Sequence, residues 1–200
     1  MSHIYFMCWK STVKTPTFSI FPRKESWLAH ELIPILEGKH IFPGECYFRK
    51  ILVGKKGLIY RDVAVADPVW QNYPPNAFAW PIFSEPLKQL IQENVSEAAN
   101  IDWIKMSVEH FQDKRQYYIL KFNELHDVID KENTLYVRGT DNIIRPCFRK
   151  INFDKVQIAT IPTSGNLWKI TSGVYVSGKL KKAIEKSGTP GIEFSKTRAI

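Results

Sequence analysis

The segment ELHDVID carries the side chains best suited to catalysis or metal binding. His126 and Asp130 lie four residues apart and would share one face if the segment were helical, with Glu124 close by. Imidazole and carboxylate groups can hold a metal ion or move protons, so a site around His126, Asp127 and Asp130 is one hypothesis. No further histidine or cysteine completes a ligand set, and aspartates also suit turns and caps. We therefore predict neither a metal ion nor catalytic residues here.

Motifs of common catalytic and nucleotide-binding sites are missing from the chain. The sequence has no Gly-x-Ser-x-Gly elbow, no His-Glu-x-x-His pair and no glycine-rich dinucleotide loop. GKKG at 54–57 is too short for a phosphate loop and leads into another apolar stretch rather than a helix. The three cysteines, Cys8, Cys46 and Cys147, are widely spaced and fit reduced, buried thiols. We expect a protein that is not an enzyme and binds no cofactor.

The segment GKLKKAIEK places four lysines within eight residues. Its apolar residues recur at helical spacing, at Leu180, Ala183 and Ile184. If these face inward, Lys179, Lys182 and Lys186 lie on the opposite side of the helix. Two interpretations stay open: the solvated side of an ordinary helix, or a docking surface for an acidic partner.

The net charge of +8 is confined to the last third of the chain. Residues 1–136 hold 16 Lys and Arg against 16 Asp and Glu, whereas residues 137–200 hold 12 against 4. This asymmetry predicts a local positive potential that can attract an anionic partner.

The first 75 or so residues consist of strand-like stretches and turns. ECYFRKILV and LIYRDVAV flank the GKKG loop, which predicts a β-hairpin. A helix is expected over 26–38, where apolar residues recur at helical spacing between Ser26 and Gly38. These elements predict a β-rich amino-terminal lobe over 1–78.

The stretch DPVWQNYPPNAFAWP, residues 67–81, is too rich in proline for a regular element. It is a candidate junction between two lobes. Its aromatic residues, among them Trp80, either form an exposed recognition surface or clamp the loop onto its own core.

A strand–helix–strand pattern occurs twice, about 93 residues apart. Aligning Ser84 with Ser177 matches Leu87 with Leu180 and Ile91 with Ile184. The serines suit helix N-caps, Pro86 suits a first helical turn, and Ser187-Gly188 suits a helix end. We predict an α+β fold with a mainly antiparallel sheet, a few helices packed on one face, and this unit duplicated, with 79–200 forming the second region.

The order of YYILKFNELHDVIDKENT and VYVSGKLKKAIEKSGTPGIEF resembles immunity proteins of bacterial polymorphic toxin systems. The resemblance runs from about Trp80 to Phe194. The matching positions are Tyr117, Tyr118, Asp127, Asp130, Ser177, Leu180, Gly191 and Phe194. It implies a cytoplasmic protein that binds a cognate toxin from the same or a sibling cell and blocks it, with no catalytic residues.

The expected partner is therefore a toxin protein, bound through a few buried aromatic and arginine side chains and charged neighbours. The candidate contact residues are Trp80, Arg145, Arg149, Lys179, Lys182 and Lys186. Nucleic acid is the alternative partner, because the pI is near 9.3, although no RNA-binding signature or zinc finger is present. No run approaches eighteen apolar residues, so no membrane association is expected.

Overall fold

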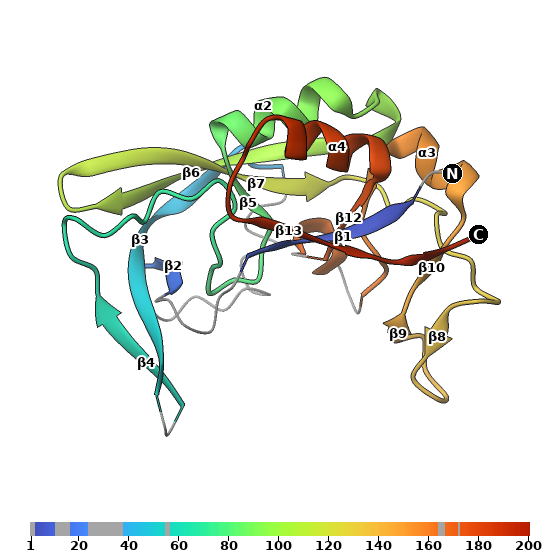
Figure 1. Cartoon of the computed structure of the whole chain (residues 1–200), viewed down its shortest axis with the longest axis horizontal. Coiled ribbons are helices and arrows are strands. Elements are labelled where there is room, and N and C mark those ends of the chain that lie inside the picture. The colour runs from blue at the N-terminus through green and yellow to red at the C-terminus, as the bar shows by residue number, and fades with distance from the viewer. Residues whose placement is uncertain (1–2, 11–16, 24–37, 55–56, 164–166, 172) are drawn as a thin grey trace.

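The computed structural model describes residues 3–10, 17–23, 38–54, 57–163, 167–171 and 173–200 (Figure 1). The helices are α2 (Glu85–Asn94), α3 (Lys150–Val156) and α4 (Gly178–Lys186), with short 3-10 turns η1 (Glu97–Ala99) and η2 (Leu167–Ile170). The strands are β1 (Ile4–Trp9), β2 (Thr17–Pro22), β3 (Ile41–Gly54), β4 (Gly57–Asp62), β5 (Ile82–Ser84), β6 (Ile101–His110), β7 (Asp113–Phe122), β8 (Leu135–Tyr136), β9 (Ile143–Arg145), β10 (Cys147–Phe148), β11 (Ile158–Ala159), β12 (Val174–Ser177), β13 (Ile192–Lys196) and β14 (Arg198–Ala199).

The predicted α+β class is confirmed, but the strands form more than one sheet. A four-stranded antiparallel sheet has the order β11-β12-β1-β13. A six-stranded sheet has the order β2-β3-β6-β7-β5 with β4 on β3, and it is mixed because β3 and β6 run parallel. Two small ladders, β8-β9 and β10-β14, complete the described strands.

Helices α2 and α4 pack side by side and cover both main sheets from the same side (Figure 1). The predicted apolar positions are the buried ones, because Leu87 and Ile91 of α2 and Leu180 and Ile184 of α4 are at most 1% exposed. They share one core cluster with β1, β7 and β12. The helical layer therefore joins the two sheets through a common apolar core.

Helix α4 begins and ends where local chemistry predicts. The Ser177 hydroxyl oxygen accepts a hydrogen bond from the backbone N–H of Leu180 at 3.2 Å, which caps the first turn. Gly188 has φ 69°, a left-handed conformation that glycine adopts without steric cost. Ser84 occupies the same position before α2 but makes no cap bond, and its hydroxyl donates to Asn72 Oδ1 at 2.6 Å.

The two strand–helix–strand segments share one arrangement around a third strand. Strands β5 and β6, connected through α2, lie on either side of β7. Strands β12 and β13, connected through α4, lie on either side of β1. All four flanking strands run antiparallel to the strand that they enclose.

The correspondence includes a tyrosine on each enclosed strand. The Nζ of Lys88 lies 3.9 Å from the ring centroid of Tyr118, and the Nζ of Lys181 lies 4.9 Å from that of Tyr5. A lysine of the neighbouring strand is the pairing partner in both sheets: Lys105 faces Tyr118, and Lys196 faces Tyr5.

The proline-rich loop covers the second face of the six-stranded sheet. Trp80 is 2% exposed and stacks on Phe78, with ring centroids 4.4 Å apart. Asn76 holds the loop, since its side-chain oxygen accepts from the N–H of Trp80 at 3.0 Å and its amide donates to the Trp80 carbonyl at 2.8 Å. Trp80 is therefore a core residue, and the expectation of a surface contact at this position is corrected.

The hairpin predicted around residues 54–57 is confirmed as β3 and β4. The helix predicted over 26–38 falls, apart from Gly38, outside the described residues. The proposed division at residue 78 stays a prediction, while β1 pairs with β12 and β13, and β3 pairs with β6.

Candidate functional site

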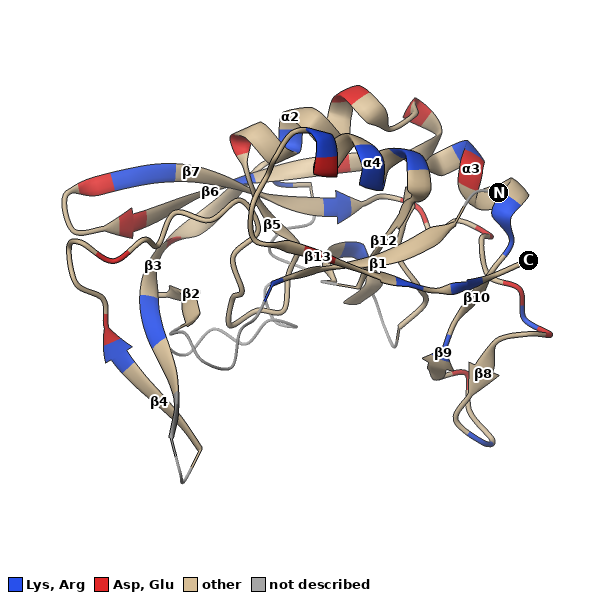
Figure 2. Cartoon of the chain, viewed as in Figure 1, with Lys and Arg blue, Asp and Glu red and all other residues tan. Residues whose placement is uncertain are grey.

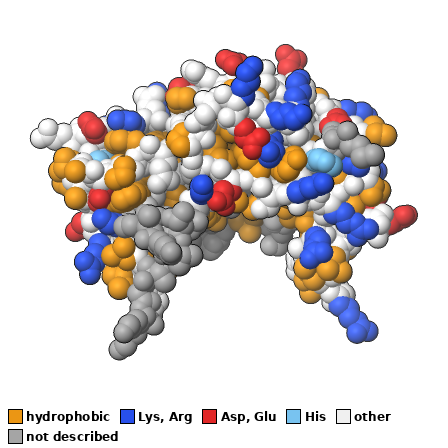
Figure 3. All heavy atoms as spheres, viewed as in Figure 1, with side chains coloured by type: hydrophobic (Ala, Val, Ile, Leu, Met, Phe, Trp, Pro, Cys, Tyr) orange, Lys and Arg blue, Asp and Glu red, His pale blue; other side chains and the backbone are white. Residues whose placement is uncertain are grey.

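The lysines predicted to face outward on α4 are exposed. Lys179, Lys182 and Lys186 all belong to the exposed class and form no ion pair with the described residues. Figure 2 shows basic positions along α4 in the helical layer, with acidic positions on the neighbouring α2, and Figure 3 shows basic side chains on the outer surface of this side of the molecule. Because no carboxylate of the described residues lies within ion-pair distance of these three lysines, their charge is available to a partner.

Lys181 differs from these three lysines because it is held in place. Its Nζ lies 2.7 Å from Glu185 Oε1, four residues on, and above the ring of Tyr5. This ammonium group therefore has both an anionic and an aromatic partner within the protein.

The side chain of Arg149, a candidate contact residue, is hydrogen-bonded to other residues of the same chain. Its NH2 nitrogen lies 2.8 Å from Asp127 Oδ1, and the guanidinium donates through two nitrogens to the Ile129 carbonyl at 3.1 and 2.9 Å. The residue precedes α3 and joins that helix start to the 127–129 loop. These internal bonds engage the Nε and Nη2 donors, so Arg149 is a weaker contact candidate than its sequence position suggested.

Arg145 lies at the end of β9 and is exposed. It forms part of the wall of a cavity of about 440 Å³, together with Lys196 and Arg198. The other lining residues are Phe6, Pro146, Tyr175 and Thr197. Figure 2 shows one basic position at the end of β13 and another just beyond it, near β10. No local spacing pattern marks this site, because its lining residues come from four separate segments of the chain.

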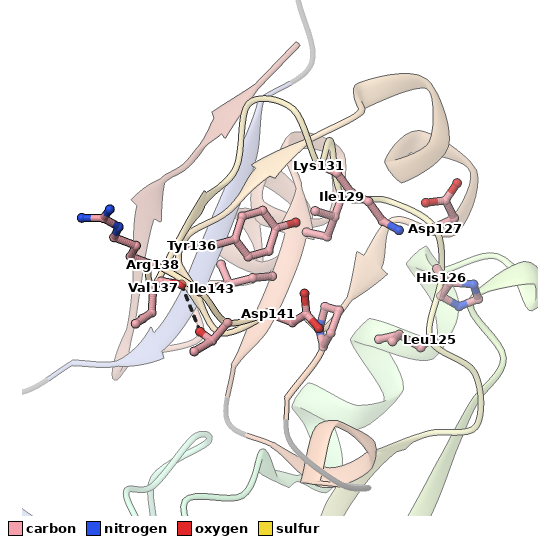
Figure 4. A pocket seen from close by; sticks show the side chains of 13 residues that line it. Leu125, His126, Asp127, Ile129, Lys131, Tyr136, Val137, Arg138, Asp141 and Ile143 are labelled. Carbon is pink, nitrogen blue, oxygen red and sulfur yellow. Dashed lines mark hydrogen bonds between the residues drawn. The ribbon is translucent and has the colours of Figure 1, made fainter.

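A second cavity, of about 710 Å³, lies between the β8–β9 hairpin and the 125–131 loop (Figure 4). His126 and Asp127 lie on one side of it, and Tyr136 and Val137 on the other. The His126 Nε2 atom is 2.8 Å from the Ala99 carbonyl, and Asp127 pairs with Arg149. Both groups therefore have partners within the fold.

Asp130 has a local structural role. Its Oδ1 accepts from the backbone N–H of Asn133 at 2.8 Å and from the Asn133 amide at 2.9 Å, so the predicted turn chemistry is confirmed. Hydrogen bonding from Asn133 lowers the pKa of Asp130. Within the described ranges, no group of three histidine, cysteine, aspartate or glutamate residues is placed to hold a metal ion.

The three cysteines are free thiols, and the predicted burial holds for two of them, whereas Cys8 is half-buried. Cys46 and Cys147 are buried, and burial raises the pKa of Cys46 to about 12. A thiol with a pKa this high is protonated at neutral pH and is a poor nucleophile.

Apolar side chains are exposed on the edge strand β4. Leu58, Ile59 and Tyr60 are 58%, 43% and 44% exposed, and β4 pairs with β3 alone among the described strands. An edge of this kind has free backbone groups that can pair with another chain. It is a second surface at which a protein partner could bind.

None of the helices in the described segments has the length and apolar character needed to cross a membrane.

Comparison with known proteins supplies the family. The model of the immunity protein family Imm11 matches residues 57–199, which is more than half of the chain. The matched range includes the α4 lysines, Arg145 and the cavity residues from Tyr175 to Arg198, whereas Phe6 lies outside it. No curated protein matches the chain. The resemblance to immunity proteins is confirmed, and the chain belongs to the Imm11 immunity protein family.

Proposed function

We propose that this chain binds a cognate toxin of a bacterial polymorphic toxin system in the cytoplasm and blocks it without catalysing a reaction. The observation that carries the proposal is the family match over residues 57–199. The structure is compatible with it, because the groups of the candidate catalytic segment are hydrogen-bonded within the fold. Inhibition by binding needs only a complementary surface that covers or immobilises the toxin's working parts.

We place one part of the contact surface on the outer face of α4. Lys179, Lys182 and Lys186 are exposed and unpaired within the described structure, so they present a positive field to an approaching partner. A field of this sign suits an acidic surface on the toxin. It would accelerate association more than it would strengthen the final complex.

The sign of the charge also bears on the type of toxin. A toxin that cuts nucleic acid usually carries a positive cleft, and a direct plug for that cleft should be acidic. A protein with net charge +8 is poorly suited to that position. We therefore expect either a toxin with another activity or binding away from the cleft, and a complex with the α4 lysines inside a basic active site would contradict this expectation.

Nucleic-acid binding is the second candidate function, favoured only by the excess of basic residues after residue 136. Binding driven by phosphates weakens steeply as salt rises, because bound counterions are released. A protein that binds neither duplex nor single strands at low salt would remove this candidate.

We also infer that the β5-α2-β6 and β12-α4-β13 segments are two copies of one unit. The matched buried positions on α2 and α4 support this inference, as does the lysine above a tyrosine in each copy. In the first copy the enclosed strand follows its unit along the chain, and in the second it is the amino-terminal β1. If the two copies are equivalent, replacing Leu87 or Leu180 by alanine should lower the free energy of unfolding by a similar amount.

The test of the proposed function is affinity capture from the lysate of the source cell, after nuclease treatment, with low-salt and then high-salt washes. One protein retained in near-equal amount through the high-salt wash supports the proposal. The captured protein is then produced alone and assayed for toxicity in cells with and without this chain. Loss of all bound material with nuclease or salt, or a retained protein that is not toxic, contradicts the proposal.

A further inference from the structure

The cavity beside β13 and β14 is built by strands that are distant in the sequence. Phe6 of β1 pairs with both Tyr175 of β12 and Ser195 of β13. Lys196, Thr197 and Arg198 follow on the β13 side, and Arg145 comes from β9. The Thr197 hydroxyl and backbone N–H both donate to the Ile4 carbonyl at 2.9 Å, which fixes the turn between β13 and β14. The wall is therefore set by sheet pairing rather than by a free loop.

The lining of this cavity carries positive charge without an internal counter-ion. Arg145, Lys196 and Arg198 line it, and none of the lining residues is acidic. Arg145 and Lys196 form no ion pair or hydrogen bond through their side chains with the described residues, and Arg198 contacts only neutral oxygens of Asn133 in that part of the chain. The positive charge of Lys196 also lowers the pKa of the nearby His3. The positive charges of these three side chains are therefore available to attract an anion that enters the cavity.

Tyr175 adds a hydroxyl group to the residues that line the cavity. The side chain is 7% exposed, and its hydroxyl has no hydrogen-bond partner among the described residues. Its ring packs against Phe6 and Phe148, with centroids 5.4 and 4.7 Å away. Burial raises the pKa of Tyr175 to about 12, so the hydroxyl keeps its proton and can donate a hydrogen bond. A ring this enclosed offers a donor but no open face on which a base could stack.

We propose that this cavity receives an acidic side chain, Asp or Glu, of the protein that the chain neutralises. A carboxylate matches the guanidinium of Arg145 and can accept from the Tyr175 hydroxyl, and the enclosed Tyr175 ring offers no open face for base stacking. The volume of about 440 Å³ has room for one side chain. The inference rests on the proposed function for the identity of the partner. The α4 lysines then guide approach, and the cavity holds the complex.

The first test needs no toxin. Nuclear magnetic resonance of the whole chain is recorded during titration with the capped peptide N-acetyl-Glu-Glu-amide, with N-acetyl-Gln-Gln-amide as the uncharged match. We expect millimolar binding of the Glu peptide, with shifts at Phe6, Tyr175 and Thr197, and no such shifts with the Gln peptide. Equal shifts with both peptides, or none with either, overturn the proposal. Larger shifts at the same residues with a single-stranded oligonucleotide overturn it in favour of nucleic acid.

The second test uses the captured toxin and two matched double variants. Arg145→Gln with Lys196→Gln removes two cavity charges, and Arg138→Gln with Lys155→Gln removes one arginine and one lysine at exposed positions outside the cavity. We expect the cavity variant to dissociate from the toxin at least about 10-fold faster than the unmodified chain does. The dissociation rate of the control variant should stay within about twofold of that of the unmodified chain. Equal dissociation rates for the two variants overturn the cavity proposal while leaving the proposed function intact. The absence of any toxic partner overturns the proposed function alone, because the peptide titration still tests the cavity.

Discussion

Replacing Lys179, Lys182 and Lys186 together by glutamate should slow association with the toxin while leaving the fold unchanged. Each replacement changes the charge by two units, so the net charge falls from +8 to +2. All three side chains are exposed and form no ion pair with the described residues, so no internal contact is lost. The change therefore acts on the external field of α4.

The effect on stability is expected to be small because the local terms oppose one another. Lys179 lies in the first turn of α4 and Lys186 in the last. A glutamate is favoured at the helix start and disfavoured at the end, by about 0.3–1 kcal/mol each, so these contributions roughly cancel. Repulsion between positions 182 and 186 is similar for two lysines and two glutamates. We expect the free energy of unfolding to change by less than about 1 kcal/mol.

The association rate is measured by stopped-flow fluorescence, using the six tryptophans of the chain as reporters. Electrostatic guidance accounts for about 10-fold or more in rate, so we expect a decrease of at least that size at low salt. The difference should shrink at about 1 M salt, where the screening length falls to about 3 Å.

The matched control is the replacement of Lys10, Lys39 and Lys105 by glutamate. These lysines are exposed, unpaired among the described residues and outside α4, and the total charge change is the same. Equal slowing by both variants would assign the effect to net charge rather than to α4. An unchanged rate for the α4 variant would refute the reasoning and leave these lysines as the solvated face of an ordinary helix.

Four further substitutions test the fold by urea unfolding. Leu87→Ala and Leu180→Ala each remove a side chain that is 0% exposed, so both should cost about 2–5 kcal/mol; a cost below about 1 kcal/mol for one of them would contradict equivalent roles. Ser177→Ala should cost about 1 kcal/mol through loss of the α4 cap, and an unchanged midpoint would show that the cap bond is not stabilising. The lowered pKa of Asp130 means that its contribution is present above the unfolded value of about 3.9 and is lost as pH falls through the folded value. As the pH falls below about 4, the free energy of unfolding should therefore decrease less for the Asp130→Ala variant than for the unmodified chain. Parallel plots of this free energy against pH for the two proteins would contradict the prediction.

Local spacing was enough to predict helix α4 and the side on which its lysines lie. The apolar period places Leu180 and Ile184 inward, and Ser177 and Gly188 supply the ends, all within twelve residues of sequence. The same was true of the β3–β4 hairpin. Each of these features depends on interactions between residues that are close along the chain.

The environment of individual aromatic and basic residues was not predictable in the same way. For Trp80 the sequence left both a surface and a core position open, and Asn76 together with the six-stranded sheet decides for the core. Arg149 was a candidate contact residue, but the Ile129 carbonyl and the Asp127 carboxylate accept hydrogen bonds from its guanidinium. In both cases tertiary packing determines which residues contact the side chain, and amino-acid composition does not reveal these contacts.

The sequence alone was sufficient to predict the α+β class, the excess of positive charge after residue 136 and the immunity-protein pattern, because composition, periodicity and motif order are all carried locally. The pairing of β1 between β12 and β13 needed the folded chain. That pairing brings Phe6 beside Tyr175 and Lys196, and strand β9 adds Arg145. Strand partners are selected by long-range burial and backbone hydrogen bonding, so a cavity assembled from residues more than a hundred positions apart leaves no local pattern in the sequence.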